Sequence, residues 1–195
     1  MNKTRRPGRI KFFLDFDGVL QTPNASEHWS RTRTRRVTYR NTDGTPHPGF
    51  VITWAPELVT QLEELIDEFD LELLYLTSWL YPESALTSFL ATIGGLRGGH
   101  ALRMPQREDG LYLPWRWKIQ EIHRVTTAEP GPVIWIDDID ARTFGHEISE
   151  SELGHPSLVL APDSDTGLTR DHLDQIRTFC QGVSTRQQAA GGQEA

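Results

Sequence analysis

Cysteine, lysine and long apolar stretches are all scarce in this chain of 195 residues. The single cysteine, Cys180, excludes an internal disulfide framework and a zinc site built from cysteines. No apolar run approaches the roughly 20 residues of a membrane-spanning helix, so we expect no membrane association. The basic start of the chain runs straight into an aspartate, without the apolar core and cleavage site of a secretory signal. A cytoplasmic location is therefore predicted.

The net charge of −7 argues against a general nucleic-acid binder, since basic surface supplies most of the affinity for phosphate backbones. The basic residues are unevenly placed, however, and two interpretations of one cluster remain open. Arginines interleaved with Trp29 and Tyr39 could grip a phosphate backbone and stack on bases. Arginine and threonine alternating at period two are equally typical of an exposed strand face. The cluster comprises Arg31, Arg33, Arg35, Arg36 and Arg40.

The length suits one domain, which we place at residues 10–182. Residues 1–9 are predicted to form a flexible basic tail and residues 183–195 a polar disordered tail. Within the domain, strands alternate with helices, which predicts an α/β fold with a parallel sheet between helices. Residues 21–53 are expected to be a small insert, or flap, after the first strand.

Apolar patterns and turn residues give the expected elements. The predicted strands are 10–15, 71–76, 101–104, 133–136 and 157–160. The predicted helices begin near Pro56, at 82, at Pro114 and at 168. Asp43-Gly44 predicts the turn of a hairpin within the insert.

The most informative stretch is KFFLDFDGVL, residues 11–20. It delivers Asp15 and Asp17 to the carboxyl end of a buried strand, where open α/β sheets bind their ligands. Two carboxylates so close repel each other, and a divalent cation with oxygen ligands is the usual remedy. The alternative is a strand that simply ends in an Asp-Gly turn at Gly18.

Three further places carry related chemistry. Thr77 and Ser78 follow the second strand, where hydroxyl and N–H groups can hold phosphate oxygens; their ordinary role would be a helix cap. Lys118 is the only lysine beyond residue 11, in a chain with seventeen arginines and three lysines. A point charge on a flexible stem suits a phosphoryl oxygen beside a carboxylate. Asp137 and Asp138 end the fourth strand, and a pair of acids there would be an awkward turn without a cation.

This ordered set of motifs resembles the haloacid dehalogenase (HAD) superfamily of phosphatases, over about residues 10–180. DFDGVL, YLTSW, WIDDID and LAPDSDTGLTRDHLDQI resemble, more closely, the HAD domain of Swiss-Army-knife RNA repair proteins. The resemblance implies a Rossmann-like three-layer α/β/α sandwich with a mostly parallel five-stranded sheet. It also implies a hydrolase, specifically a Mg²⁺-dependent phosphatase that forms an aspartyl-phosphate intermediate.

The resemblance also implies roles for individual residues. Asp15 would attack phosphorus, and Asp17 would act as general acid and base. Thr77 and Lys118 would stabilise the equatorial oxygens of the transition state.

The expected Mg²⁺ ligands are Asp15, the backbone carbonyl of Asp17, and Asp138. Asp137 would support these ligands, although Asp137 and Asp138 could exchange roles. The second aspartate of the DxD pair disfavours dehalogenase chemistry, which needs no leaving-group acid.

The substrate-binding residues are expected to be Gly18 and Ser78 beside the carboxylates, with Arg33, Arg35 and Arg36 on the insert. An arginine-rich flap on an otherwise acidic protein favours a phosphorylated substrate at the end of an RNA or DNA strand, or a nucleotide. Two alternatives remain open: a small-metabolite phosphatase of the same mechanism, and a non-catalytic module that binds nucleic acid or protein. The sequence leaves open the oligomeric state, the choice of 5′ or 3′ phosphate, and the choice of RNA or DNA.

Overall fold

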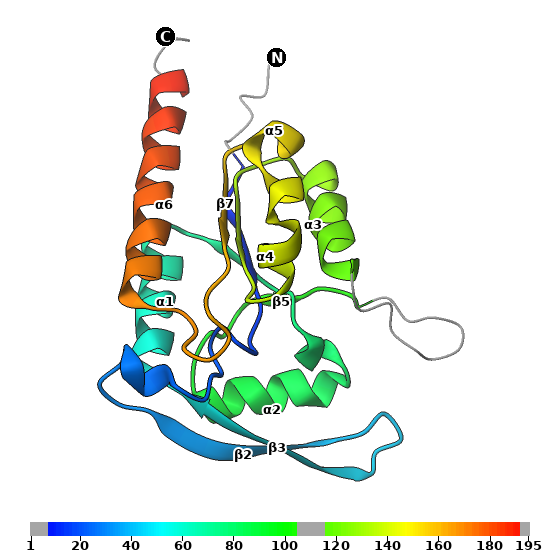
Figure 1. Ribbon diagram of the computed structural model, residues 1–195. Helices are drawn as coiled ribbons and strands as arrows, with labels where there is room; N and C mark the ends of the chain where they lie inside the picture. The colour runs from blue at the N-terminus through cyan, green and yellow to red at the C-terminus, as the bar shows by residue number, and fades with distance from the viewer. Residues whose placement is uncertain (1–7, 105–115, 192–195) are drawn as a thin grey trace.

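A computed structural model describes residues 8–104 and 116–191 of the chain, and Figure 1 shows its architecture. A five-stranded parallel sheet has the order β5-β4-β1-β6-β7. The strands are β1 (Lys11–Leu14), β4 (Glu72–Tyr75), β5 (His100–Ala101), β6 (Val133–Ile136) and β7 (Ser157–Leu160). This arrangement confirms the predicted α/β fold with a parallel sheet.

The central strand explains how the layers form. All four residues of β1 are buried, as expected for a parallel strand covered on both faces. Because successive side chains point to opposite faces, Phe12 and Leu14 enter one apolar cluster and Phe13 enters another. The sheet therefore has two separate cores, one on each face.

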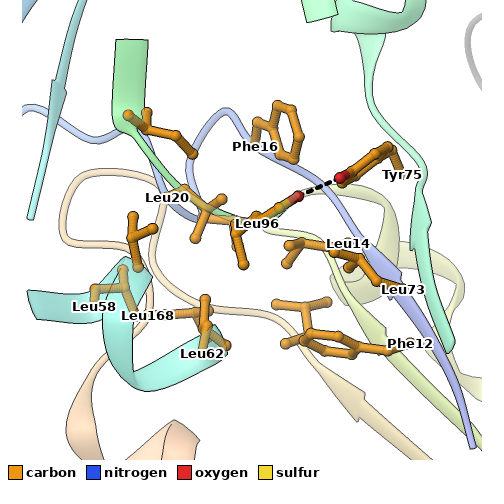
Figure 2. Packing of buried hydrophobic residues seen from close by; sticks show 14 of the residues in the cluster. Phe12, Leu14, Phe16, Leu20, Leu58, Leu62, Leu73, Tyr75, Leu96 and Leu168 are labelled. Carbon is orange, nitrogen blue, oxygen red and sulfur yellow. Dashed lines mark hydrogen bonds between the residues drawn. The ribbon is translucent and has the colours of Figure 1, made fainter. Parts of the chain in front are cut away.

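Helices α1 (Pro56–Glu68) and α6 (Arg170–Gly191) cover the first face, where Leu58, Leu62 and Leu168 pack near Phe12 (Figure 2). Helix α3 (Trp117–Ala128) covers the second face, together with the short elements that follow β6. Those elements are α4 (Asp140–Phe144), the 3-10 helix η3 (Gly145–Ile148) and α5 (Glu150–Leu153). No pattern in the sequence had predicted these three elements.

The insert forms a long antiparallel hairpin at the end of the molecule where β1 finishes (Figure 1). Its strands are β2 (Arg33–Arg40) and β3 (Pro46–Trp54), preceded by the 3-10 helix η1 (Ala25–Glu27). The predicted turn is confirmed, since Gly44 has a φ of +83° and the Asp43 carboxylate accepts the Thr45 N–H at 2.9 Å. Both ends of the insert meet at the domain, where the Thr22 N–H donates to the Thr53 carbonyl at 3.0 Å.

Helix α2 (Glu83–Ile93) lies between this hairpin and the sheet (Figure 1). It follows the 3-10 helix η2 (Ser78–Leu80). The Arg40 N–H donates to the Ser84 hydroxyl at 3.2 Å, which fixes β2 against α2. Buried Val37 and Ile52 anchor the hairpin to the first apolar cluster.

Several expected boundaries were wrong. Residues 183–191 do not form a disordered tail: they extend α6 to Gly191, because Val183 is buried in the first core and the Gln- and Ala-rich sequence favours helix. The strand expected at 101–104 is only the two-residue β5. Arg9, placed in the basic tail, is held to the domain by a 2.5 Å ion pair with Asp70. The expected start of a helix at Pro114 and the remainder of the tail, residues 1–7, lie outside the described residues.

Two tryptophans expected in the core, Trp117 and Trp135, are indeed buried, and Trp115 lies outside the described residues. Among residues 8–104 and 116–191, no helix has both the length and the hydrophobicity of a transmembrane segment.

Candidate active site

The three central strands end level with one another and deliver polar residues to one edge of the sheet. Leu14 is in register with Tyr75 on one side and with Ile136 on the other. Asp15, Thr77 and Asp137 follow these strand ends within two residues. The positions predicted from three separate motifs therefore meet at the carboxyl edge of the sheet.

Lys118, the second residue of α3, joins two of these strands electrostatically. Its Nζ lies 2.5 Å from Asp15 Oδ2 and 2.6 Å from Asp137 Oδ2, and its side chain is only 10% exposed. Burial alone would lower the pKa of Lys118, but the charges of Asp15 and Asp137 outweigh burial and raise it. The lysine is therefore a fixed cation at neutral pH.

Both carboxylate oxygens of Asp137 accept hydrogen bonds, from Lys118 and from the turn that follows β6. While its Oδ2 accepts Lys118, its Oδ1 accepts the N–H groups of Ile139 at 3.1 Å and Asp140 at 2.6 Å. The neighbouring Asp138 points instead at Gly18, where an added Cβ would lie 2.0 Å from Asp138 Oδ2. Gly18, with a φ of +65°, is thus required both for the turn and for the close approach of this carboxylate.

Asp15, Asp137 and Asp138 each offer a carboxylate oxygen within 4.8 Å of the others, and all three are buried. Three carboxylates at this spacing, opposed by one lysine, leave excess negative charge. Hard oxygen donors of this kind fit a divalent cation such as Mg²⁺. Asp138 accepts no hydrogen bond from the described residues, which favours it over Asp137 as a metal ligand. Asp15 is hydrogen bonded on both oxygens, by Lys118 Nζ and by the Phe16 N–H at 2.6 Å, so these bonds would have to share it with the metal.

The protonation of Asp15 supports the same conclusion. Burial raises its pKa to about 7, although Lys118 opposes this rise; Asp137 adds to it. The charge of Lys118 therefore does not fully offset burial. A second cation beside Asp15 would lower this pKa and keep the carboxylate ionised at neutral pH.

Asp17 is set apart from this cluster. It is exposed, and its Oδ2 accepts the indole N–H of Trp79 at 3.0 Å. Desolvation raises its pKa and the Trp79 hydrogen bond opposes that rise, with smaller effects from Lys118 and Asp138. A carboxyl group with a raised pKa that substrate can reach suits the predicted acid and base role.

Thr77 and Ser78 lie beside Asp17. Thr77 is fully buried at the start of η2, where its hydroxyl oxygen accepts the Trp79 N–H at 3.4 Å. This is the helix-cap role expected of an ordinary threonine, and its hydroxyl proton remains available for a phosphate oxygen. Ser78 is exposed, and a hydrogen bond from it tends to lower the pKa of Asp17.

The arginines of the insert are exposed on the hairpin and contribute no side chain to the carboxylate cluster. Arg33, Arg35 and Arg36 all lie on β2, which the period-two alternation had indicated as an exposed strand. Their predicted contact with substrate stays a prediction. Trp29, weighed as a base-stacking residue, is 2% exposed and donates its indole N–H to the Leu168 carbonyl, so it is a core residue.

Sequence reasoning missed two residues of the site. Asp140 Oδ2 lies 3.7 Å from Lys118 Nζ, and burial, reinforced by Asp137, raises the pKa of Asp140. The third acid of WIDDID was a visible signal for it. Trp79 was missed because a tryptophan after Thr77-Ser78 gives no indication of bonding a carboxylate 62 residues away.

Comparison with known proteins adds an independent finding. The model of the HAD domain in Swiss Army Knife RNA repair proteins matches residues 12–173, which include every site residue described above. No curated protein matches the chain. Since the match covers most of the sequence, the chain belongs to the family of HAD domains found in Swiss Army Knife RNA repair proteins.

Proposed function

We propose that this HAD domain is a Mg²⁺-dependent phosphomonoesterase that forms an aspartyl-phosphate on Asp15 and acts on the ends of nucleic acids or on nucleotides. One observation carries the proposal: Lys118 Nζ lies within 2.6 Å of both Asp15 and Asp137, while Asp17 is held separately by Trp79. A buried carboxylate fixed by a cation and an accessible acid beside it are the two groups that stepwise phosphate transfer needs.

In the first displacement a carboxylate oxygen of Asp15 attacks phosphorus, and the bond from phosphorus to the leaving oxygen breaks. Asp17 gives its proton to that oxygen, which leaves as an alcohol. The Asp15 N–H donates to the Ile136 carbonyl at 3.0 Å, so neighbouring strands fix the position of the nucleophile. Lys118 and the Thr77 hydroxyl are available to neutralise the charge on the phosphoryl oxygens.

In the second displacement Asp17 takes a proton from water, which attacks phosphorus as the bond to Asp15 breaks. Inorganic phosphate is released and Asp17 is protonated again. Mg²⁺ held by Asp15 and Asp138, when bound, would supply positive charge to the phosphoryl group. The full set of charged groups argues against a non-catalytic binding module, because burying several carboxylates is costly unless the site uses them.

The choice of a nucleic-acid end rests on the family and on the exposed arginines of β2. The hairpin is a flap rather than a closed lid, and an open site admits the end of a polymer. The exposed guanidinium groups on this flap could bind the backbone phosphates next to the end of an RNA or DNA strand.

The experiment is a measurement of phosphate release with Mg²⁺ or with EDTA. The substrates are RNA and DNA oligonucleotides with 5′ or 3′ phosphates, nucleotides and sugar phosphates. Release that needs Mg²⁺ and is abolished in Asp15→Asn is expected. Asp174→Asn, an exposed aspartate on α6, is the matched control and should retain full activity. Release that persists in Asp15→Asn would overturn the mechanism, and release confined to sugar phosphates would overturn the substrate.

The arginine argument has its own test. Replacing Arg33, Arg35 and Arg36 together by glutamine should weaken turnover of oligonucleotides and reduce its dependence on salt. The matched control replaces three arginines outside the hairpin, Arg124 on α3 and Arg177 and Arg186 on α6. Equal oligonucleotide turnover in the two triple variants would refute the assignment.

A further inference from the structure

A hollow of about 320 Å³ lies directly beside Asp17, between the hairpin and the η2–α2 segment. The hairpin contributes three successive residues of β3, Phe50, Val51 and Ile52. The remaining lining, which includes Tyr39 of β2, is polar and aromatic apart from Ala85. It comprises Asp17, Gln21, Tyr39, Ser78, Trp79, Tyr81 and Ala85.

The hollow displays apolar surface to solvent. Phe50, whose ring is on the wall formed by the hairpin, is 54% exposed. The Phe50 ring meets the edge of Trp79 at a centroid distance of 5.8 Å, and Tyr39 stacks on His47 behind it. A large aromatic side chain that remains exposed beside other aromatic rings commonly belongs to a binding surface, and aromatic faces are suited to planar ligands.

Its position relative to the chemistry indicates which part of a substrate it would hold. This step rests on the proposed function, in which Asp17 protonates the leaving oxygen. Asp17 itself lines the hollow, whereas Asp15 and Lys118 do not. The group attached to the leaving oxygen would therefore lie in the hollow, and the phosphoryl group beyond it.

The positive charge of the hairpin indicates what kind of leaving group the hollow would hold. In the strand register Arg35 pairs with Ile52, which lines the hollow, whereas Arg36 pairs with Val51 and lies on the opposite face of the hairpin, so only Arg35 flanks the hollow. The Arg36 guanidinium donates to the carbonyls of Pro48 and Gly49, at 3.3 and 3.4 Å. Arg35 is exposed and makes no hydrogen bond or ion pair with the described residues. An aromatic hollow next to a free cation complements a chain in which flat bases alternate with phosphates.

We infer that this hollow is a nucleoside subsite: it stacks the base of the terminal, phosphate-bearing nucleotide on Phe50, while Arg35 binds the next phosphate of the strand. Gln21 and Ser78 supply polar groups for the edge of the base. Binding of the base in this hollow would position the leaving oxygen of the substrate beside Asp17.

The test compares oligonucleotides whose phosphate-bearing terminal residue either has its base or is abasic. In the wild type, removing the base should lower kcat/KM by about 5- to 150-fold, the range of base–aromatic stacking. In Phe50→Ala, the ratio of kcat/KM for the base-containing oligonucleotide to kcat/KM for the abasic one should fall close to one. Phe50→Trp should restore the ratio of the wild type. Thr42→Ala, at the exposed tip of the same hairpin, is the control and should keep the ratio of the wild type.

Binding separates this inference from the proposed function. Fluorescence anisotropy of the same labelled oligonucleotides with Asp15→Asn needs no turnover, and tighter binding of the base-containing strand is expected. Equal binding of the base-containing and abasic oligonucleotides, or equal wild-type kcat/KM for the two, would overturn the subsite even if the protein releases phosphate rapidly. Preferential turnover of a phosphotyrosine peptide would assign the hollow to a phenol and overturn the nucleoside assignment. Absence of phosphate release with base-dependent binding would overturn the proposed function and uphold the subsite.

Discussion

Replacing Lys118 by methionine should destabilise the metal-free protein strongly. Methionine keeps much of the buried aliphatic volume but removes the only cation within 4 Å of Asp15 and Asp137 among the described residues. Removing one partner from a buried ion pair costs about 3–5 kcal/mol, because the other charge is left uncompensated. With a urea dependence of about 2 kcal/mol per molar, the midpoint of unfolding should fall by about 1.5–2.5 M in EDTA.

The loss should depend on pH with a defined sign. Burial already raises the pKa of Asp15 in the folded protein to about 7, above its ordinary value of 3.8, and loss of the lysine raises it further. The folded variant then binds more protons than the unfolded chain, so its stability falls as the pH rises from about 4 to 8. The deficit relative to the wild type should accordingly be smaller at pH 5 than at pH 8.

Magnesium should reverse part of the loss. A cation held by the folded carboxylate cluster would stabilise the folded state, and removal of a neighbouring positive charge favours its binding, so the midpoint should rise more in the variant than in the wild type. Arg177→Met is the control: it breaks an exposed 3.0 Å pair with Glu68, worth about 0–1 kcal/mol, and should show no such Mg²⁺ response. Equal midpoints for Lys118→Met and wild type in EDTA would refute the electrostatic account of the site.

Two further predictions concern a glycine and a thiol. Gly18→Ala should abolish the rise in Tm that Mg²⁺ produces, because the new Cβ would displace Asp138. Gly44→Ala, also at positive φ but with no atom within 4 Å, should cost only about 1–2 kcal/mol and keep the Mg²⁺ response; loss in both variants would contradict this reasoning. Cys180 is fully buried, and burial raises the pKa of its thiol to about 12, so a thiol reagent at pH 8 should label it slowly in the native protein and quickly in denaturant. Rapid native labelling would show that α6 opens readily.

The parts of the fold that the sequence predicted are those where local pattern and tertiary role agree. Short uninterrupted apolar runs such as 133–136 are typical of strands buried on both faces, and their ends place the acids that follow. The gathering of Asp15, Thr77 and Asp137 at one edge then follows from parallel topology alone. For this reason the position of the site was predictable before any contact was known.

The parts that escaped prediction depend on contacts distant in sequence. Nothing local distinguishes Asp137 from Asp138, since their roles are set by Lys118 on one side and Gly18 on the other. Trp29 lies among arginines in the sequence, yet its indole bonds a carbonyl 139 residues away. The last turns of α6 look polar and unstructured in isolation, but Val183 ties them to the core.

The hydrogen bond that joins the two ends of the insert has a consequence for how this domain can change. Because Thr22 and Thr53 are hydrogen bonded, the chain leaves the core and returns to it at nearly one point. The tip of the hairpin, beyond the buried Val37 and Ile52, could therefore be lengthened or replaced without moving the start of α1 or the carboxylates. Under the proposed function, the carboxylate site and the tip of the hairpin would then be separable parts, and an engineer could change the substrate by exchanging the tip alone.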